Sequence, residues 1–276
     1  MNIGGESDAV VNNHSAVIFQ KDHARQLLKN KYILILGDSV QRTVYKGNRT
    51  HIELELMECL DLVALLYNSE MLTQRELAQS CEKEHRGDEL VAATMKNIGD
   101  KFMEVREFVN DGYVLIRYVF MSRIWESNGD TQQLLDALTS DHFPDVLLVN
   151  SLFWDVSKYG DRPIIDQKTK MKRFTGFENN LHRFIKYFEN REELICKNEK
   201  SGRIPCLKIW RSTMPISETA NTEPLTGTKS NMVKLVEEIS HTNYWAEQII
   251  QSYNWDIIDA QFWFRKGGSN LIYIHQ

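Results

Sequence analysis

The chain has 276 residues, of which 42% are hydrophobic and 26% charged, and its formal net charge is −5. This composition is typical of a soluble globular protein, and the length suits one α/β domain or two small ones. The negative charge excludes an electrostatic case for nucleic acid or an anionic membrane as partner, and no apolar run approaches the roughly 20 residues of a membrane-spanning helix.

The start of the chain is polar. Residues 1–16 are rich in glycine and asparagine, which predicts a disordered lead-in before a single domain over residues 17–276. Because the start shows neither a basic segment nor an apolar leader, we expect a cytoplasmic protein. The four cysteines have no CxxC spacing, which argues against a zinc or redox motif.

The apolar run YILIL at residues 32–36 ends at Gly37, Asp38 and Ser39, and a helical pattern follows. A short continuous apolar run predicts a fully buried parallel strand. Such a strand brings its next side chains to the carboxyl edge of a sheet, where open α/β folds bind ligands. Ser39 is therefore a candidate nucleophile beside helix N-terminal N–H groups. The same residue types are common helix N-caps, so that interpretation stays open.

Strands and helices then alternate along the chain. Residues 81–95 are charged and weakly periodic and are predicted as a surface excursion. Further strands are predicted over residues 114–120, 144–150, 205–210 and 255–259, and helices over residues 23–30, 52–67, 131–138, 174–194 and 232–252. This alternation predicts a mostly parallel sheet with helices on both faces.

Asn150 is the second candidate site residue. It ends a buried strand, as Ser39 follows one, so we expect the two to face one crevice. A carboxamide N–H at that place is a suitable donor to a developing oxyanion. Asparagine also caps and turns loops, and position alone leaves that alternative open.

Four sequence blocks, GDSVQRTVYK, VNSLFWDVSKYG, IWRSTMP and DIIDAQFWFR, occur in this order between about Gln26 and Arg265. Together they resemble the PC-esterase domain-containing proteins, a branch of the GDSL/SGNH-like acyl-esterases. The resemblance implies a three-layer α/β/α, flavodoxin-like fold with a mostly parallel sheet. It also implies an esterase or acyltransferase site that needs no metal or organic cofactor. In it, Ser39 would be the nucleophile and Asn150 the oxyanion donor.

The same resemblance implies that Gly37, Asp38, Arg42 and Trp154 serve the oxyanion or the substrate. Arg42 could lean back over the site, or form a surface ion pair worth at most about 1 kcal/mol. Trp154 could line an acyl pocket or close the core. The expected ligand is a small acyl ester, and the oligomeric state is left open.

Two features depart from the family pattern. Residues 47–60 form an apparent insertion behind the nucleophile, and the late Asp-x-x-His block that supplies the base in relatives is missing from the sequence. His275 has Ile272 in the place of that acid, and Gln261 stands where relatives often carry histidine. We therefore expect a poor esterase, or alternatively a catalytically inactive binding or scaffolding module. An alternatively spliced or mis-assembled gene product would explain both departures.

Other polar residues have simpler interpretations. Asp256 and Asp259, near the last strand, are expected to be structural. His182 and His241 are expected on the surfaces of amphipathic helices. The basic cluster at residues 168–173 predicts a solvated face.

Overall fold

The computed structural model describes residues 21–46, 87–93, 103–110, 114–126, 129–198, 204–216 and 232–264. The predicted lead-in at residues 1–16, the apparent insertion at residues 47–60 and His275 lie outside these ranges.

A seven-stranded sheet in the order β2-β3-β4-β1-β5-β8-β9 forms the centre of the described structure. Its strands are β1 (Lys31–Gly37), β2 (Asp88–Ala93), β3 (Glu104–Asn110), β4 (Val114–Phe120), β5 (Val146–Asn150), β8 (Leu207–Arg211) and β9 (Asp256–Ile258). The strands from β4 to β9 are parallel, whereas β2 and β3 are antiparallel at one edge. Numbered along the chain, the parallel strands have the flavodoxin-like order 2-1-3-4-5. The predicted mostly parallel α/β fold is confirmed.

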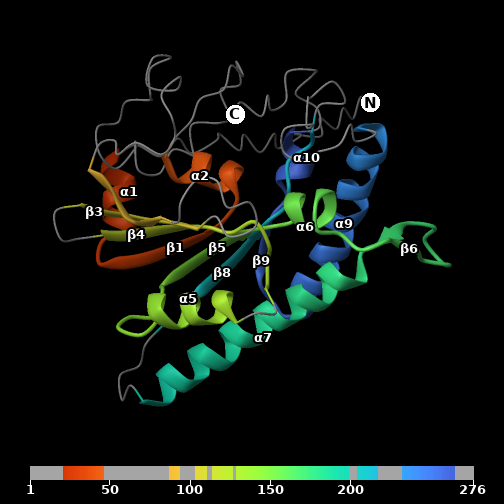
Figure 1. Ribbon diagram of the computed structural model, residues 1–276. Helices are drawn as coiled ribbons and strands as arrows, with labels where there is room; N and C mark the ends of the chain where they lie inside the picture. Colours follow the sequence, from red (N-terminus) through yellow and green to blue (C-terminus); the bar gives the residue numbers. More distant parts are fainter. Residues whose placement is uncertain are drawn as a thin grey trace, which may run out of the picture.

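Helices cover both faces of this sheet, with α1 and α2 on one side and α5 and α7 on the other (Figure 1). The helices are α1 (Lys21–Leu27), α2 (Ser39–Lys46), α5 (Asp130–Leu138), α6 (Phe153–Ser157), α7 (Thr175–Asn198), α9 (Met232–Ser252) and α10 (Ala260–Phe264). A short hairpin of β6 (Ile164–Ile165) and β7 (Lys172–Arg173) projects beside α9. Among the described helices, none combines the length and the apolar character needed to cross a lipid bilayer.

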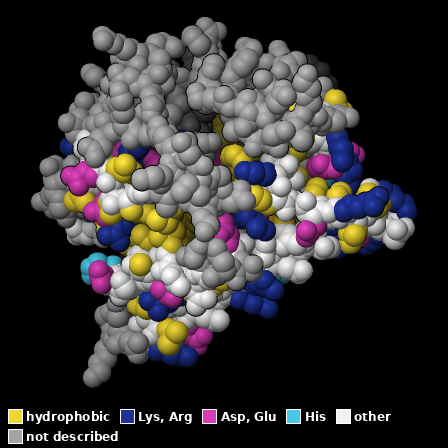
Figure 2. Space-filling model, in the orientation of Figure 1, with side chains coloured by type: hydrophobic (Ala, Val, Ile, Leu, Met, Phe, Trp, Pro, Cys, Tyr) yellow, Lys and Arg dark blue, Asp and Glu magenta, His cyan; other side chains and the backbone are white. Residues whose placement is uncertain are grey.

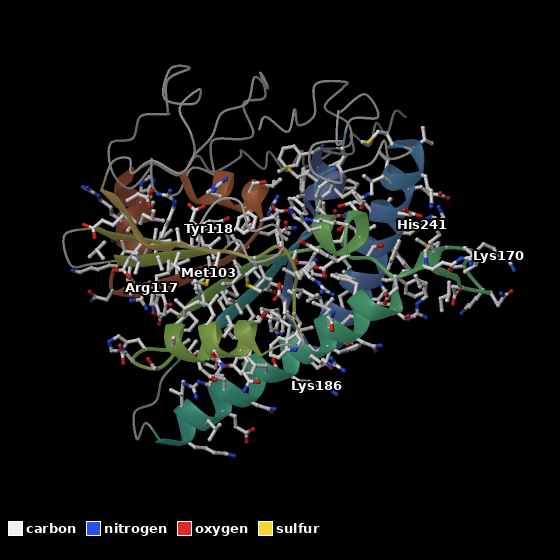
Figure 3. The ribbon with its side chains drawn as sticks, viewed as in Figure 1. Met103, Arg117, Tyr118, Lys170, Lys186 and His241 are labelled. Carbon is white, nitrogen blue, oxygen red and sulfur yellow. The ribbon has the colours of Figure 1, made fainter. Side chains whose placement is uncertain are left out.

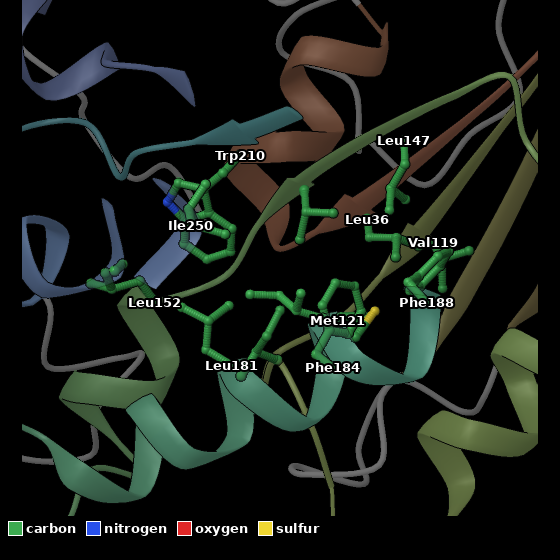
Figure 4. Close-up of a cluster of buried hydrophobic side chains, with 14 of the residues drawn as sticks. Leu36, Val119, Met121, Leu147, Leu152, Leu181, Phe184, Phe188, Trp210 and Ile250 are labelled. Atoms are coloured by element: carbon green, nitrogen blue, oxygen red, sulfur yellow. The ribbon is translucent and has the colours of Figure 1, made fainter. Parts of the chain in front are cut away.

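The central strand β1 is buried on both faces. Leu36 belongs to the larger hydrophobic cluster, which includes Phe184 and Phe188 of α7 (Figure 4). Ile35, the adjacent residue, points to the opposite face and belongs to a second cluster with Ala24 of α1. Because successive side chains of a strand alternate between faces, burial on both sides produces a continuous apolar run. Packing on both faces fixes the carboxyl end of β1, where the GDS turn begins.

The antiparallel edge of the sheet was not predicted. The expectation of a surface excursion over residues 81–95 is wrong for the part that forms β2, and β3 had no predicted counterpart. Besides the apolar Val105 and Phe108, the buried positions of these strands carry the charged residues Asp88, Glu104 and Arg106. Since charged residues occupy inward positions, the apolar alternation that marks a half-buried strand is missing there.

Candidate active site

The carboxyl ends of β1 and β5 meet at one place. Gly37, the last residue of β1, is paired in register with Asn150, the last residue of β5. The strand order reverses between these two strands, which is the usual ligand site of open α/β sheets. A pocket at this place is lined by Asp38, Ser39, Val40, Asn150, Phe153, Trp154, Arg211, Thr213, Met214 and Ile216. The structure therefore brings Ser39, Asn150 and Trp154 to one pocket.

The turn before Ser39 is tightly packed. A Cβ atom on Gly37 would lie 2.5 Å from the Asn150 carbonyl oxygen and 2.6 Å from Cβ of Gln41. From β4, the Tyr118 hydroxyl donates hydrogen bonds to the carbonyl of Asp38 at 2.8 Å and to that of Gly37 at 3.2 Å. The backbone of the turn is thereby fixed, and a side chain at position 37 would push β1 away from β5 and α2.

Asp38 is the N-cap of α2. Its Oδ1 accepts the N–H of Val40 at 2.9 Å and that of Gln41 at 3.4 Å. The capping interpretation that the sequence left open therefore describes Asp38. Burial raises the pKa of the Asp38 carboxyl, and the Arg211 guanidinium opposes that shift. Two first-turn N–H groups of α2 are thus bonded to Asp38, while half-buried Ser39 lines the pocket.

Asn150 is buried and joins β5 to the loop after β8. Its Nδ2 donates to the Arg211 carbonyl at 2.8 Å and more weakly to Thr213 Oγ1 at 3.3 Å. Asn243 of α9 holds the same loop, because its Oδ1 accepts the Thr213 N–H at 2.9 Å and its Nδ2 donates to the Thr213 carbonyl at 2.8 Å. The Asn150 carboxamide is therefore held at the wall of the pocket by a short bond and a long one.

Arg42 is not among the residues that line the pocket. Its Nη1 forms an ion pair with Glu104 of β3, and its guanidinium lies 6.0 Å from the ring centre of Phe120. The Arg42 side chain is only 13% exposed, and that of Glu104 only 1%. Of the two alternatives from the sequence, the structure shows an ion pair, but a mostly buried one that continues through Glu104 to Arg106.

Arg211 is a pocket residue that sequence reasoning did not select. It ends β8 and is 1% exposed, and its Nε donates to Oε1 of Gln41 at 2.8 Å. Neither Nη1 nor Nη2 has a hydrogen-bond partner among the described residues. Burial lowers the pKa of Arg211 to about 10, and the charge of Asp38 opposes that shift. The signal in the sequence is a charged residue directly after Trp210, at the end of the predicted strand.

No histidine of the described segments lines the pocket. His182 Nδ1 lies 3.0 Å from the Tyr253 hydroxyl. His241 of α9 accepts the N–H of Lys172 at 3.2 Å, beside the β6–β7 hairpin (Figure 3). Both residues are on helices, as the sequence predicts, and both contact other elements there.

The acidic residues near β9 also have structural contacts. Asp259 Oδ1 accepts the Phe262 N–H at 2.8 Å, at the start of α10, and Asp256 is exposed. Gln261 of α10 accepts a hydrogen bond from Asn243 Nδ2 at 3.0 Å. Gln261 thus supports the residue that holds the loop after β8.

The basic cluster lies on the β6–β7 hairpin and is visible at the projecting edge of the molecule (Figure 2). Lys172 Nζ lies 2.6 Å from Glu237 Oε2, and Arg173 pairs with Glu178. These pairs fit the predicted solvated face. In the part of the chain that the structure describes, no group of three or more His, Cys, Asp or Glu side chains is arranged to hold a metal ion.

Known proteins resemble the chain over nearly all of its length. PC-esterase domain-containing protein 1B of Homo sapiens is 30% identical over 262 residues, which are 92% of this chain and 52% of that protein. PC-esterase domain-containing protein 1A of Homo sapiens is 28% identical over 260 residues, 90% of this chain and 48% of that protein. The chain therefore spans about half the length of the curated relatives it matches. No protein-family model matches, and neither does any solved structure.

Proposed function

This chain is a homologue of the PC-esterase domain-containing proteins over at least 90% of its length, and from that premise we propose that it acts on a carboxylic ester, with Ser39 as the nucleophile. The single observation that carries the proposal is that Ser39 and Asn150, from two strands far apart in the sequence, line one pocket. That pocket lies at the strand-order reversal, where the fold class binds ligands.

The proposed reaction has two steps. The Ser39 hydroxyl oxygen attacks the ester carbonyl carbon, the bond to the alcohol oxygen breaks, and the alcohol leaves with a proton. Water then attacks the acyl-serine, which releases the carboxylic acid and restores the hydroxyl. A base must accept the Ser39 proton. No described histidine lines the pocket, so the experiment below also includes a chain extended by the Asp-x-x-His block of the relatives.

Asn150 is the proposed oxyanion donor. Its 2.8 Å bond to the Arg211 carbonyl holds the carboxamide in place, and the 3.3 Å contact with Thr213 is the weaker of the two. An incoming acyl oxygen that replaces Thr213 as acceptor would use the same N–H without a change of rotamer. Loss of one such donor costs about 10²–10³-fold in kcat where it has been measured.

The test is labelling by a fluorophosphonate probe together with hydrolysis of 4-nitrophenyl butyrate, on the chain as printed and on the extended chain. Labelling and hydrolysis are expected to disappear in Ser39→Ala and to persist in Ser140→Ala, a matched change at an exposed serine. If neither chain is labelled, the esterase proposal is wrong and the pocket belongs to a catalytically inactive binding module.

The remaining finer points of the proposal rest on the sequence. They are a single domain over residues 17–276 with an insertion at residues 47–60, a cytoplasmic location, and a small acyl ester as ligand. Trp154 and its neighbour Phe153 supply an apolar wall that suits a small acyl group.

A further inference from the structure

The guanidinium of Arg211 is a buried cation with unused donors. The residue is 1% exposed, and its Nε donates to the neutral carbonyl oxygen of Gln41 at 2.8 Å. Its two terminal nitrogens are buried and have no hydrogen-bond partner among the described residues. Buried guanidinium groups are normally paired, because leaving a charged donor unsatisfied costs more than the bond itself contributes. This arrangement therefore indicates a group that the protein alone does not supply.

The position of the guanidinium connects it with the pocket. Arg211 lines the pocket from the end of β8, and its side chain reaches Gln41 in the first turn of α2. In the sheet, β5, which carries Asn150, lies between β1 and β8. Arg211 thus lines the same pocket as Ser39 and Asn150, at the proposed reaction centre.

We propose that Arg211 is an anion-binding residue of this pocket and that its ligand is a monoanionic carboxylate attached to a small apolar body. The two terminal nitrogens of a guanidinium match the two oxygens of a carboxylate in a bidentate pair.

The charges near Arg211 favour a ligand with a single negative charge. The charge of Asp38, which lines the same pocket, already offsets part of the Arg211 cation. One guanidinium beside an acidic residue cannot neutralise a dianion such as a phosphate monoester, whose second charge would be buried without a partner. A carboxylate carries only one charge.

The other residues that line the pocket favour a ligand with an apolar hydrocarbon part. Phe153, Trp154, Met214 and Ile216 line the same pocket. A ligand with a carboxylate at one end and a short hydrocarbon chain at the other would satisfy Arg211 and cover these side chains. This inference deepens the proposed function, because ester hydrolysis releases a carboxylic acid, but the binding experiment below does not require catalysis.

The experiment compares butyrate with butyramide, which has nearly the same shape and no charge. Binding is measured by calorimetry and by tryptophan fluorescence, to which Trp154 in the pocket contributes. Wild-type protein is expected to bind butyrate about tenfold or more tightly than butyramide, as charge-assisted hydrogen bonds would give. Equal binding of the two would overturn the proposal, and tighter binding of inorganic phosphate than of butyrate would overturn the monoanion assignment.

Variants locate the effect. Arg211→Gln is expected to abolish the preference for butyrate, whereas Arg117→Gln, at a partly exposed guanidinium paired with Glu107, keeps it. A preference that survives in a folded Arg211→Gln protein contradicts the assignment, and if that variant does not fold, the wild-type comparison decides. Ser39→Ala, which removes the proposed nucleophile, is expected to keep the preference. Failure of the esterase proposal would therefore leave this result unchanged.

Two sources could supply the carboxylate, namely the released acid or a free carboxylate on the ester itself. In an active chain, Arg211→Gln weakens product inhibition by butyrate if the acid is the source. If the carboxylate belongs to the substrate, the same variant raises KM for 4-nitrophenyl hydrogen succinate, which carries a free carboxylate, and leaves KM for 4-nitrophenyl butyrate unchanged. Either result supports the proposal, and the absence of both changes would exclude a role of this site in the reaction.

Discussion

Two buried arginines at different places in the sheet have different surroundings. Arg106, on the antiparallel edge, is fully buried and bonded to Glu104 and to Asp88, whose carboxylate lies 3.0 Å away. Arg211, at the carboxyl end of β8, is equally buried, but among the described residues its side chain has one hydrogen-bond partner, the neutral carbonyl oxygen of Gln41. The first cation thus has carboxylate hydrogen-bond partners, whereas the second has a neutral one and only the charge of Asp38 to offset part of its own.

Buried arginines in this fold are therefore expected to have two different roles, one in stability and one in binding. A buried charge with carboxylate partners fixes elements relative to one another, and removing one partner leaves the others uncompensated. A buried charge whose donors remain unused raises the free energy of the folded state, and such local conflicts concentrate at functional sites. The edge network is therefore expected to govern stability, and Arg211 to govern ligand binding.

The largest expected effect is that of Arg106→Met. The change removes the guanidinium that pairs with the buried carboxylates of Asp88 and Glu104, so the free energy of unfolding should fall by about 3–5 kcal/mol. Urea unfolding followed by circular dichroism measures it. If Arg106→Met lost less free energy of unfolding than Arg211→Met, the proposed difference between the two arginines would be wrong. The edge network would then contribute no more to stability than the pocket does.

The parallel strands could be predicted from the sequence, whereas the antiparallel edge could not. The parallel strands are marked by continuous apolar runs, because their side chains are buried on both faces, as Leu36 and Ile35 are. In β3, Glu104 and Arg106 occupy buried positions, where Arg106 pairs with Glu104 of the same strand and with Asp88 of β2. No periodicity rule for apolar residues detects such a strand.

At the candidate site, the placement of Ser39 and Asn150 at one pocket could be predicted, because chain position alone decides it. Ser39 and Asn150 were selected because residues that follow parallel strands reach the same edge of a sheet. Arg211 was not selected, because the burial of its guanidinium depends on Gln41, which is 170 residues away in the chain. Arg42 was assigned by resemblance, and only the tertiary structure shows its partner to be Glu104.

Asp155 is a buried acidic group whose hydrogen bonds come from neutral donors, with the Arg123 guanidinium farther away at 3.9 Å. It accepts hydrogen bonds from the Ser151 hydroxyl at 2.8 Å and the Ile124 N–H at 3.0 Å. Burial raises the pKa of Asp155 from 3.8 to about 6, against the effect of these bonds. The folded protein therefore holds this proton more tightly than the unfolded chain, so its contribution to stability is present at low pH and lost as the pH rises.

A shift of about two pKa units corresponds to about 3 kcal/mol. In the wild type, this group should lower the free energy of unfolding by about that amount as the pH rises from about 4 to about 6.5. In Asp155→Asn, this decrease should be absent. Chemical unfolding of both proteins across this range measures the difference. If the free energies of unfolding of the two proteins depend on pH in the same way, the pKa of Asp155 is ordinary. Burying this carboxylate would then cost little free energy.

Arg211→Met is expected to destabilise the protein by less than about 2 kcal/mol, roughly the loss of one hydrogen bond to a charged group. The variant loses the bond to Gln41 and the attraction of Asp38, but it also removes a desolvated cation. Urea unfolding under the conditions used for Arg106→Met gives the value. A destabilisation that matches Arg106→Met would assign Arg211 a structural role.

The smallest effect is expected for Arg117→Met, which supplies the baseline for the whole series. Arg117 stands directly opposite Glu107 on β3, with Nε 2.6 Å from the carboxylate, but the two side chains are 30% and 25% exposed. Exposed pairs of this kind contribute about 1 kcal/mol or less, and salt weakens them. The loss should therefore shrink further in about 1 M sodium chloride, where the Debye length is about 3 Å, whereas the loss in Arg106→Met should persist because its partners are buried. If salt abolished both effects, burial would not be what separates the two kinds of arginine.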